Sequence, residues 1–205
     1  MAGKGMLIII SGPSGAGKGT VCRALLEQDD KLVLSVSKTT RSPRAGEQDG
    51  VNYNFVSKEV FLKAVADGDF LEHACVYGEY YGTPRSSLEQ MLAFGNDVIL
   101  EIDTQGALKV KNSGVNCVFI FLLPPSADEL FRRITRRGTE SVESLRRRMA
   151  SARGELSMAS MYDYVVVNDC VDEARDSIAA VIRAERCRVH RNMDLIEAII
   201  EEAKE

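Results

Sequence analysis

The sequence contains few of the residues that staple small extracellular domains or hold structural metals. Its 205 residues include five widely spaced cysteines with no C-x-x-C pair, two histidines and no tryptophan. Scattered cysteines in odd number predict neither a disulfide framework nor a cysteine-bound zinc site. The two histidines, His73 and His190, lie far apart in the sequence, and we assign neither a chemical role. These absences favour a reduced, cytoplasmic protein.

Long apolar runs and a dominant charge are also missing. No segment approaches the roughly 20 apolar residues that cross a membrane, and residues 6–10, "MLIII", are too few for a signal peptide. The net charge of −4 gives no overall attraction for nucleic acid, so any polyanionic ligand must be held by locally placed cations. We therefore expect neither a membrane nor a nucleic-acid partner, and the sequence leaves a homo-oligomer open.

Short apolar segments rich in β-branched residues recur along the chain. They lie at residues 6–10, 32–36, 97–102, 116–123 and 164–168. Such near-continuous apolar runs are typical of strands that are covered on both faces. Segments with helical spacing lie between them, at residues 19–28, 105–111, 126–136, 143–158 and 172–190. Strands that alternate with helices predict an α/β fold, with a central parallel sheet in a three-layer arrangement.

Two intervals break this alternation. Residues 37–94 are rich in glycine and tyrosine, and they predict an inserted β-rich lobe between two parts of a core, 1–36 and 95–205. Residues 136–148, "RRGTESVESLRRR", join two helical segments and are rich in arginine, so we expect a mobile lid there. The chain is therefore expected to form one domain with an inserted lobe and a lid.

The C-terminal segment "NMDLIEAIIEEAKE" has the spacing of an amphipathic helix. A single apolar stripe on a surface helix usually packs against the rest of the protein, and we expect this here. The stripe consists of Leu195, Ile196, Ile199 and Ile200.

A glycine-rich turn follows the first predicted strand and opens the first predicted helix. Residues 12–18, G-P-S-G-A-G-K, match the phosphate-loop pattern G-x-x-x-x-G-K, although Gly19 follows the lysine and the hydroxyl comes at Thr20. Inward-pointing N–H groups, the helix dipole and Lys18 together suit a nucleoside triphosphate, although such loops serve GTPases, motors and small kinases alike. Thr20 is either a magnesium-linked hydroxyl or a threonine with a local bond. The expected loop comprises Gly12, Pro13, Ser14, Gly15, Ala16, Gly17, Lys18, Gly19 and Thr20.

Candidate residues for the acceptor follow the second and third predicted strands of the core. Arg41 and Arg44 flank Pro43, and two guanidiniums can grip one phosphate dianion, with Tyr53 adding a hydroxyl. The alternative is a solvated basic loop. Asp103 ends a buried strand beside the expected triphosphate, either as a residue of the site or as the cap of the next helix.

The sequence closely resembles the guanylate kinase family from about residue 6 to residue 185. The motifs that carry this resemblance are "SGPSGAGKGT", "SVSKTTRSPRAGEQDGVNYNFVS", "FLEHACVYGEYYGT", "ILEIDTQGA", "RRGTES" and "VVVND". The resemblance implies phosphorylation of GMP by ATP, which is expected to bind as MgATP. Guanine offers N1–H and its N2 amine as adjacent donors, which suits an ionised Glu72, so we expect GMP and dGMP to be accepted and AMP to be a poor substrate. The resemblance further implies these residues around GMP: Ser37, Arg41, Arg44, Tyr53, Glu72, Tyr81, Thr83 and Asp103.

Arginines of the expected lid are candidates for contact with the transferred phosphoryl group. Arg133 and Arg137 are one helical turn apart, so both can point at one ligand. By resemblance these two and Arg148 match phosphate-contacting positions, and Asn168 matches a residue near adenine, although a plain turn residue is the alternative there. The residues expected to act in catalysis are Lys18, Arg44, Arg133, Arg137 and Arg148.

Two other functions compete with this interpretation. Domains of the same type occur in scaffold proteins as non-catalytic peptide-binding modules, which typically have a degraded phosphate loop. The intact loop around Lys18 argues against that class. A P-loop kinase for another nucleoside monophosphate is the second alternative, and Glu72 together with residues 37–53 argues against it.

Overall fold

The apolar segments of the sequence form a five-stranded parallel sheet. The computed structural model describes residues 4–44, 46–76, 78–135 and 142–204, and it does not describe the side chains of residues 142–148. Neighbouring strands are ordered β2-β7-β1-β8-β9, and every pair is parallel, as the sequence predicts. The strands are β1 (Leu7–Ser11), β2 (Leu32–Leu34), β7 (Asp97–Glu101), β8 (Val118–Leu123) and β9 (Tyr164–Val167).

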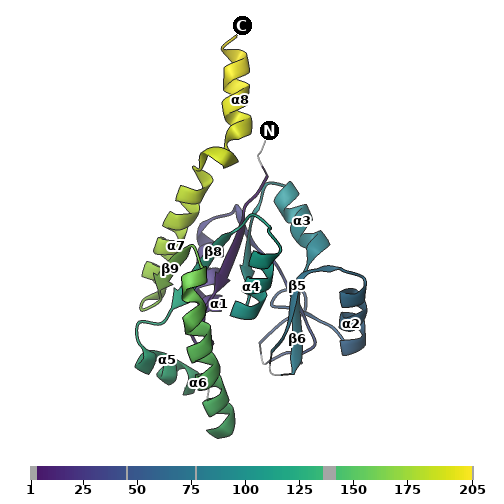
Figure 1. The fold of residues 1–205 in the computed structure, drawn as a ribbon, viewed down its shortest axis with the longest axis vertical. Helices are drawn as coiled ribbons and strands as arrows, with labels where there is room; N and C mark the ends of the chain where they lie inside the picture. Colours follow the sequence, from purple (N-terminus) through teal and green to yellow (C-terminus); the bar gives the residue numbers. More distant parts are fainter. Residues whose placement is uncertain (1–3, 45, 77, 136–141, 205) are drawn as a thin grey trace.

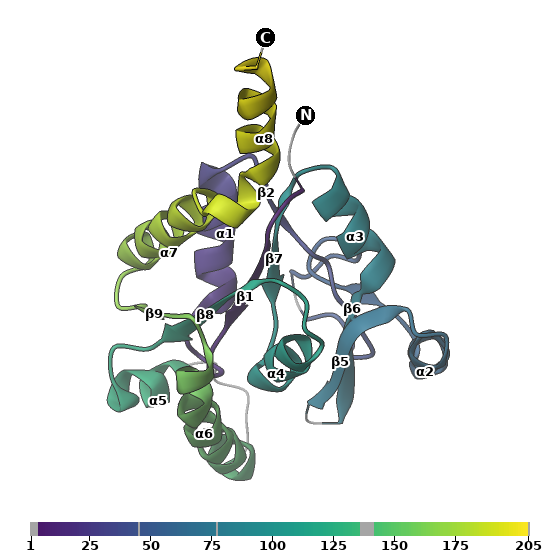
Figure 2. The ribbon, with the colours of Figure 1, turned by 45° about the horizontal axis from the view of Figure 1, so that its top comes forward.

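Helices cover the two faces of this sheet and make the fold three-layered (Figure 2). On one face lie α1 (Lys18–Gln28) and α7 (Val171–Arg186), packed on side chains such as Ile8 and Ile10. On the other lie α3 (Arg85–Ala93) and α4 (Thr104–Asn112), packed on Leu7 and Ile9. Successive residues of a strand point to opposite faces, which is why a continuous apolar run is needed to fill both cores.

Strand β9 departs from the expectation that all five strands are covered on both faces. It is one of the two edge strands of the sheet, and only one neighbour, β8, pairs with it among the described residues. Val166 is buried under α7, whereas the side chains of Val165 and Val167 are half exposed. An apolar run alone cannot distinguish an edge strand from a central one.

A second sheet forms from the interval that was expected to be an inserted lobe. Its four strands are ordered β4-β3-β6-β5. Helix α2 (Lys58–Ala66) begins at Ser57, whose hydroxyl accepts a hydrogen bond from the N–H of Val60, and its Phe61 stacks on Phe70. Helix α3 lies in the same interval but packs on the central sheet. The strands are β3 (Lys38–Thr39), β4 (Asn54–Phe55), β5 (Phe70–Val76) and β6 (Glu79–Pro84).

Two helices carry the arginine-rich part of the chain. Helix α5 (Ala127–Thr135) packs on α6 (Val142–Ser157) through a small cluster of Leu130, Ile134 and Ala152. The 3₁₀ turn η1 (Met158–Met161) then leads into β9. Of the lid expected at 136–148, residues 136–141 lie outside the described residues, and so do the side chains of 142–148.

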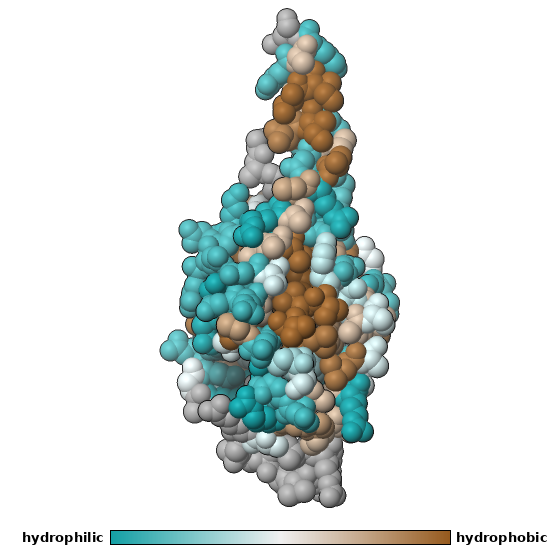
Figure 3. All heavy atoms as spheres, turned by 90° about the vertical axis from the view of Figure 1, so that its left-hand side faces the viewer, coloured by the Kyte–Doolittle hydropathy of each residue, from teal (hydrophilic) through white to brown (hydrophobic). Residues whose placement is uncertain are grey.

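The C-terminal helix does not pack as the sequence predicts. After α7 and the 3₁₀ turn η2 (Val189–Arg191), helix α8 (Met193–Glu202) projects beyond the sheet and its covering helices (Figure 1). None of its residues is buried, and its apolar stripe is open to solvent (Figure 3). The prediction that this stripe packs against the body of the protein is therefore wrong. No helix in the described ranges is long and apolar enough to span a membrane.

Candidate functional site

The glycine-rich turn joins β1 to α1 at the carboxyl end of the central sheet. Gly12 has φ 149°, and a Cβ there would stand 2.3 Å from the carbonyl oxygen of Leu122. Gly17 has φ 89°, in the left-handed region that other residues rarely adopt. The loop therefore turns tightly against the end of β8 and opens a helix, as an anion-binding loop requires.

The side chain of Lys18 folds back onto the start of this loop. Its Nζ donates hydrogen bonds to the carbonyl oxygens of Gly12 at 2.6 Å and Pro13 at 3.2 Å. Burial lowers the pKa of Lys18, and the nearby carboxylates of Glu101 and Glu155 oppose that change. The ammonium is thus held at the loop by backbone oxygens and negative charges, where a phosphate group could take their place.

Asn168 follows β9 and fastens the phosphate loop from the other side. Its Nδ2 donates a 2.7 Å hydrogen bond to the carbonyl oxygen of Ala16, and the side chain is buried. A Cβ on Gly17 would stand 2.4 Å from the same Nδ2. The sequence suggested contact with adenine for Asn168, and the structure adds a role in positioning the loop.

A carboxylate that the sequence analysis passed over lies beside the start of α1. Glu101 ends β7, and its Oε2 lies 3.3 Å from where a Cβ on Gly19 would stand. This proximity gives a structural reason for the glycine that follows Lys18 in this loop. Thr20, one residue further, is exposed in the first turn of α1 and therefore accessible to a ligand.

Helix α6 places a second carboxylate on the loop. Glu155 Oε2 accepts a hydrogen bond of 3.0 Å from the N–H of Ser14, and its Oε1 accepts one of 3.0 Å from the hydroxyl of Ser151. A loop N–H of this kind is an anion-binding group. In the described structure, the Ser14 N–H therefore donates its hydrogen bond to a carboxylate of the chain itself, Glu155.

The smaller sheet brings together the residues predicted to recognise a base. Glu72 on β5 lies opposite Thr83 on β6, and the Thr83 hydroxyl donates a 2.8 Å hydrogen bond to Glu72 Oε1. Gly106 leaves room for this carboxylate, since a Cβ there would stand 2.8 Å from Glu72 Oε2. Burial raises the pKa of Glu72 to about 7, and the charge of Asp103 adds to that increase.

A cluster of Arg41, Tyr53 and Tyr81 lies further along the same face of this sheet. Tyr81 is two residues from Thr83 on β6, so both side chains point to one side. The Tyr81 ring packs edge-on against Tyr53 at 5.9 Å, and the Arg41 guanidinium lies 5.4 Å from the Tyr53 ring. A buried carboxylate and an arginine thus occupy two ends of one surface.

The guanidinium of Arg41 forms an ion pair with the carboxylate of Glu47. Both Arg41 terminal nitrogens donate to the two Glu47 oxygens at 2.9 Å, and the backbone N–H of Arg44 donates to Glu47 Oε2 at 2.7 Å. This pairing raises the pKa of Arg41 and lowers that of Glu47. The carboxylate sits in a fork-shaped set of donors that equally fits a phosphate group.

Three further residues predicted to bind GMP, Ser37, Arg44 and Asp103, differ in burial and in their contacts. Ser37 is buried, and the side chain of Arg44 is exposed. Asp103 caps α4 by accepting a 2.8 Å hydrogen bond from Gly106 N, so the capping alternative is realised, while its charge still acts on Glu72. Asp103 therefore has a structural role next to the predicted base-binding end.

The arginine helices are only partly described at this site. Arg133 on α5 forms an ion pair of 2.6 Å with Glu129 and is partly buried. A Cβ on Gly15 would lie 3.7 Å from the Arg133 Cβ, which places α5 against the phosphate loop. Arg137 lies outside the described residues, and so does the side chain of Arg148.

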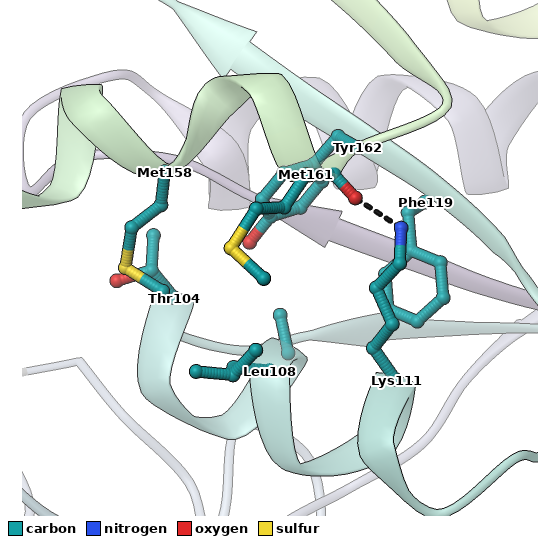
Figure 4. A pocket seen from close by; sticks show the side chains of 8 residues that line it. Thr104, Leu108, Lys111, Phe119, Met158, Met161 and Tyr162 are labelled. Carbon is teal, nitrogen blue, oxygen red and sulfur yellow. Dashed lines mark hydrogen bonds between the residues drawn. The ribbon is translucent and has the colours of Figure 1, made fainter.

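A small apolar hollow lies between α4 and η1 (Figure 4). Met158 and Met161 point into it from η1 towards Leu108 of α4. Its lining includes none of the predicted nucleotide-binding residues, so the candidate site is the set of polar groups at the strand ends. The hollow is lined by Thr104, Ala107, Leu108, Lys111, Phe119, Met158, Met161 and Tyr162.

Sequence reasoning missed three carboxylates and one glycine of the site. Glu101 could have been noticed because it ends the same strand that precedes Asp103, and Glu47 because it stands three residues after Arg44. Glu155 is 141 residues from its partner Ser14, and no local pattern could pair them. The need for glycine at position 106 is evident only in the structure, where the Glu72 carboxylate approaches it.

Known proteins with high similarity to this chain carry one family name. A family model described as guanylate kinase matches residues 4–185. A curated guanylate kinase of Clostridium perfringens (strain SM101 / Type A) is 60% identical over 92% of this chain and 87% of its own length. One from Caldanaerobacter subterraneus subsp. tengcongensis is 56% identical, with 98% and 97% covered. The crystal structure of guanylate kinase from Anaplasma phagocytophilum matches with a TM-score of 0.77 at 38% identity, covering 92% of this chain and 90% of that one.

Proposed function

The chain belongs to the guanylate kinase family, and from this premise we propose that it transfers the γ-phosphoryl group of ATP to GMP, giving ADP and GDP. The observation that carries the proposal is the buried carboxylate of Glu72 on the same sheet face as the Arg41 cluster. A nucleoside monophosphate presents a base at one end and a dianion at the other. The sheet face offers the Glu72 carboxylate as an acceptor for the base and the Arg41 guanidinium as a cation for the phosphate.

Guanine recognition follows from the chemistry of Glu72. Its carboxylate, when ionised, accepts from N1–H and the N2 amine of guanine, and the Thr83 hydroxyl holds one of its oxygens in place. Adenine would direct the lone pair of its N1 at the same oxygen. A polar mismatch in a buried site discriminates by roughly 10⁴-fold or more. Ser37 and Asp103 complete the proposed base-binding end.

The GMP phosphate is proposed to replace Glu47 as the partner of Arg41. Arg41 already stands in a fork geometry against a carboxylate, and a dianion offers a stronger charge-assisted bond. Tyr53 and Tyr81 contribute hydroxyls beside it, and the exposed side chain of Arg44 is free to turn inwards onto the same phosphate. In this proposal the loop that carries Arg41 and Arg44 exchanges the Glu47 carboxylate for the GMP phosphate, and it does not need to form a new set of donors.

On the ATP side, the phosphate loop supplies N–H groups, the dipole of α1 and the ammonium of Lys18. The γ-phosphate is proposed to take the place of Glu155 at Ser14 N, and Asn168 keeps Ala16 in the loop geometry. Arg133, Arg137 and Arg148 are proposed to neutralise the moving phosphoryl group. Arg133 would exchange its ion pair with Glu129 for that contact.

Magnesium is expected to accompany ATP. The exposed Thr20 hydroxyl in the first turn of α1 suits a hard cation, because Mg²⁺ prefers oxygen ligands and keeps most of its waters. When bound, the ion would neutralise charge on the β and γ oxygens. The protein groups do the rest by positioning the attacking GMP oxygen in line, and no general base is needed since that oxygen is already largely ionised.

The competing functions have less support. The curated relatives carry the name guanylate kinase, which does not favour a peptide-binding module or a kinase for another monophosphate. A substrate panel tests the proposal directly, with ADP release measured for GMP, dGMP, IMP, AMP and UMP at fixed MgATP. We expect kcat/KM to be highest for GMP and dGMP, lower for IMP, which lacks the N2 amine, and lower by about 10⁴-fold for AMP. Similar kcat/KM values for AMP and GMP would refute the assignment.

A further inference from the structure

One side of helix α4 packs against β5, the strand that carries Glu72 (Figure 2). Asp103, Gly106 and Lys109 are spaced three apart along this helix and its cap, so they lie on one side of it. A Cβ on Gly106 would stand 2.8 Å from Glu72 Oε2, which places this side of the helix directly on the carboxylate. One turn further, Lys109 Nζ donates a hydrogen bond to the carbonyl oxygen of His73. The lysine therefore ties α4 to the residue that follows Glu72.

The Glu72 carboxylate lies near charges of opposite sign on this side of α4. Burial raises the pKa of Glu72 to about 7, and the hydrogen bond from the Thr83 hydroxyl opposes that increase. Of the two charges, Asp103 raises the pKa of Glu72 further and Lys109 lowers it. Burial also lowers the pKa of His73, and the ammonium of Lys109 lowers it further. One cation thus acts on two consecutive residues of β5.

Other titratable side chains of the elements around β5 are directed elsewhere. On α2, Glu59 and Lys63 are exposed to solvent. The rest contact a ring, a hydroxyl or a carbonyl oxygen of another residue. They are Lys38 over the Phe70 ring, Lys58 over the Tyr80 ring, Tyr81 against the Tyr53 ring, Glu79 on the Thr40 hydroxyl, Arg85 on the carbonyl oxygen of Phe70 and Lys111 on that of Met161. Asp103 and Lys109 therefore set the balance of charge at Glu72.

We propose that Lys109 is a positioning residue for guanine recognition, which holds β5 against α4 and offsets the charge of Asp103, so that the Glu72 carboxylate is available as an acceptor. This inference rests on the proposed function, in which N1–H and the N2 amine of GMP both donate to that carboxylate. Lys109 acts through Glu72 and needs no contact with GMP. Because the lysine is exposed, solvent and salt screen its charge, and its effect should be modest.

The pH dependence of kcat/KM for GMP at saturating MgATP tests this role, because it reports the ionisation of the enzyme form that GMP binds. Lys109→Met should move the rising part of the profile to higher pH. The value of kcat/KM should be about twofold to fivefold lower than in the parent at pH 7 and should approach the parent value at pH 9. The KM for ATP should change less than about twofold.

Two further variants at the same position separate charge from tethering. Lys109→Gln keeps a donor for the carbonyl oxygen of His73 without the charge, and it should shift the profile as Lys109→Met does. Lys109→Arg keeps the charge and should restore the parent profile. Lys111→Met is the matched control, since it removes a lysine from the same helix whose ammonium donates to the carbonyl oxygen of Met161. It should leave the profile unchanged.

Carbon-13 NMR of the Glu72 carboxyl and of the His73 imidazole, in the full chain without nucleotide, gives a second readout. Both pKa values should be higher in Lys109→Met than in the parent. A parent that does not phosphorylate GMP would refute the proposed function, and the NMR titrations would still test Lys109. Profiles or Glu72 titrations that coincide in Lys109→Met and the parent would overturn the inference. An equal shift in Lys111→Met, or a parent-like profile in Lys109→Gln, would overturn it as well.

Discussion

The phosphate loop and the smaller sheet hold anions in two different ways. The loop uses backbone N–H groups, and its shape is imposed by fully buried neighbours such as Ile10 and Ala16 and by the bond from Asn168. The smaller sheet uses side chains, and only Phe61, Ala64 and Phe70 form its buried hydrophobic cluster within the described residues. We therefore expect the phosphate loop to be rigid and general, and the smaller sheet to be adjustable and specific.

A carboxylate of the chain satisfies the cationic or N–H groups in both regions. Glu155 reaches the loop from a distant helix, whereas Glu47 reaches Arg41 from within its own loop. Under the proposed function, ATP in the phosphate loop would displace a side chain that belongs to a distant helix, Glu155 of α6. GMP at the smaller sheet would rearrange one local ion pair, between Arg41 and Glu47. Changes at the loop should thus alter turnover and ATP affinity, and changes at the smaller sheet should alter choice of acceptor.

The largest effect is expected for Lys18→Ala. The variant removes the only side-chain charge of the glycine-rich loop 12–20 while it leaves the smaller sheet intact. We expect kcat to fall by about 10³-fold, comparable to the loss of a preorganised charge in other active sites. The dissociation constant for GMP, measured by calorimetry, should change less than about threefold.

Lys31→Ala, which alters an exposed lysine after α1, is the control for a lost positive charge and should keep normal kinetics. Full turnover in Lys18→Ala would contradict the proposed role of the loop. A loss of GMP affinity as large as the loss of kcat would show that the two regions are not independent.

Glu72→Gln should give the next largest effect, confined to the acceptor. An amide accepts from one guanine donor but presents its own N–H to the other, so kcat/KM for GMP should fall by about 10²- to 10³-fold. The KM for ATP should stay within about twofold of the parent value. Glu59→Gln, on the exposed side of α2, is the matched control for the loss of one carboxylate.

The same variant tests the raised pKa of Glu72. Because GMP needs the ionised carboxylate, kcat/KM for GMP should increase as the pH rises through about 7, the pKa that burial gives this group. The protonated form is favoured by folding, so the free energy of unfolding should decrease from about pH 4.5 to 7 as that proton is lost. Its contribution is of the order of 3 kcal/mol. Denaturation of Glu72→Gln should lack this component, and identical pH profiles in both proteins would contradict the pKa.

The central sheet and the loop could be predicted from sequence because their signals are local. Each apolar run becomes a strand, and the glycines before Lys18 become the turn, since neighbouring residues determine both. Helix α2 was missed in an interval judged from its glycines and tyrosines, although Ser57 at its start is a typical N-cap. Local composition is a weaker guide than periodicity and capping.

Long-range partners of the site could not be predicted in the same way. The hydrogen bonds from Asn168 Nδ2 to Ala16 O and from Ser14 N to Glu155 Oε2 join residues more than 140 positions apart, and they exist only once the sheet is assembled. The prediction for α8 failed for a related reason. A single apolar stripe predicts an amphipathic helix, but it does not show whether the rest of the protein offers a surface that covers the stripe.

Asn168→Ala should have a smaller effect, restricted to the rigid region. Loss of the 2.7 Å bond to Ala16 leaves the loop less ordered, and one such buried hydrogen bond corresponds to about a tenfold increase in the KM for ATP. Binding of GMP should be unaffected. If Asn168 acts by positioning the loop, the KM for GTP as donor should rise by the same factor. An increase for ATP alone would instead assign Asn168 to adenine.

The smallest effect, and one of opposite sign, is expected for Glu155→Gln. The amide keeps the acceptor for Ser14 N but removes the negative charge that competes with the γ-phosphate at Lys18. The KM for ATP should fall by about threefold to tenfold, since surface-accessible charges contribute energies of this size. Steady-state kinetics at low and high salt should show the advantage shrinking as salt screens the charge.

Ser151→Ala provides the matched comparison, because it removes the hydroxyl that holds Glu155 Oε1 and leaves the charge in place. It should lower the KM for ATP by a smaller factor than Glu155→Gln. Increased KM in both variants would mean that Glu155 supports the loop instead of competing with ATP. In that case the phosphate loop would need its internal carboxylate for shape, and displacement of a carboxylate by an incoming phosphate would be a property of Glu47 at the smaller sheet alone.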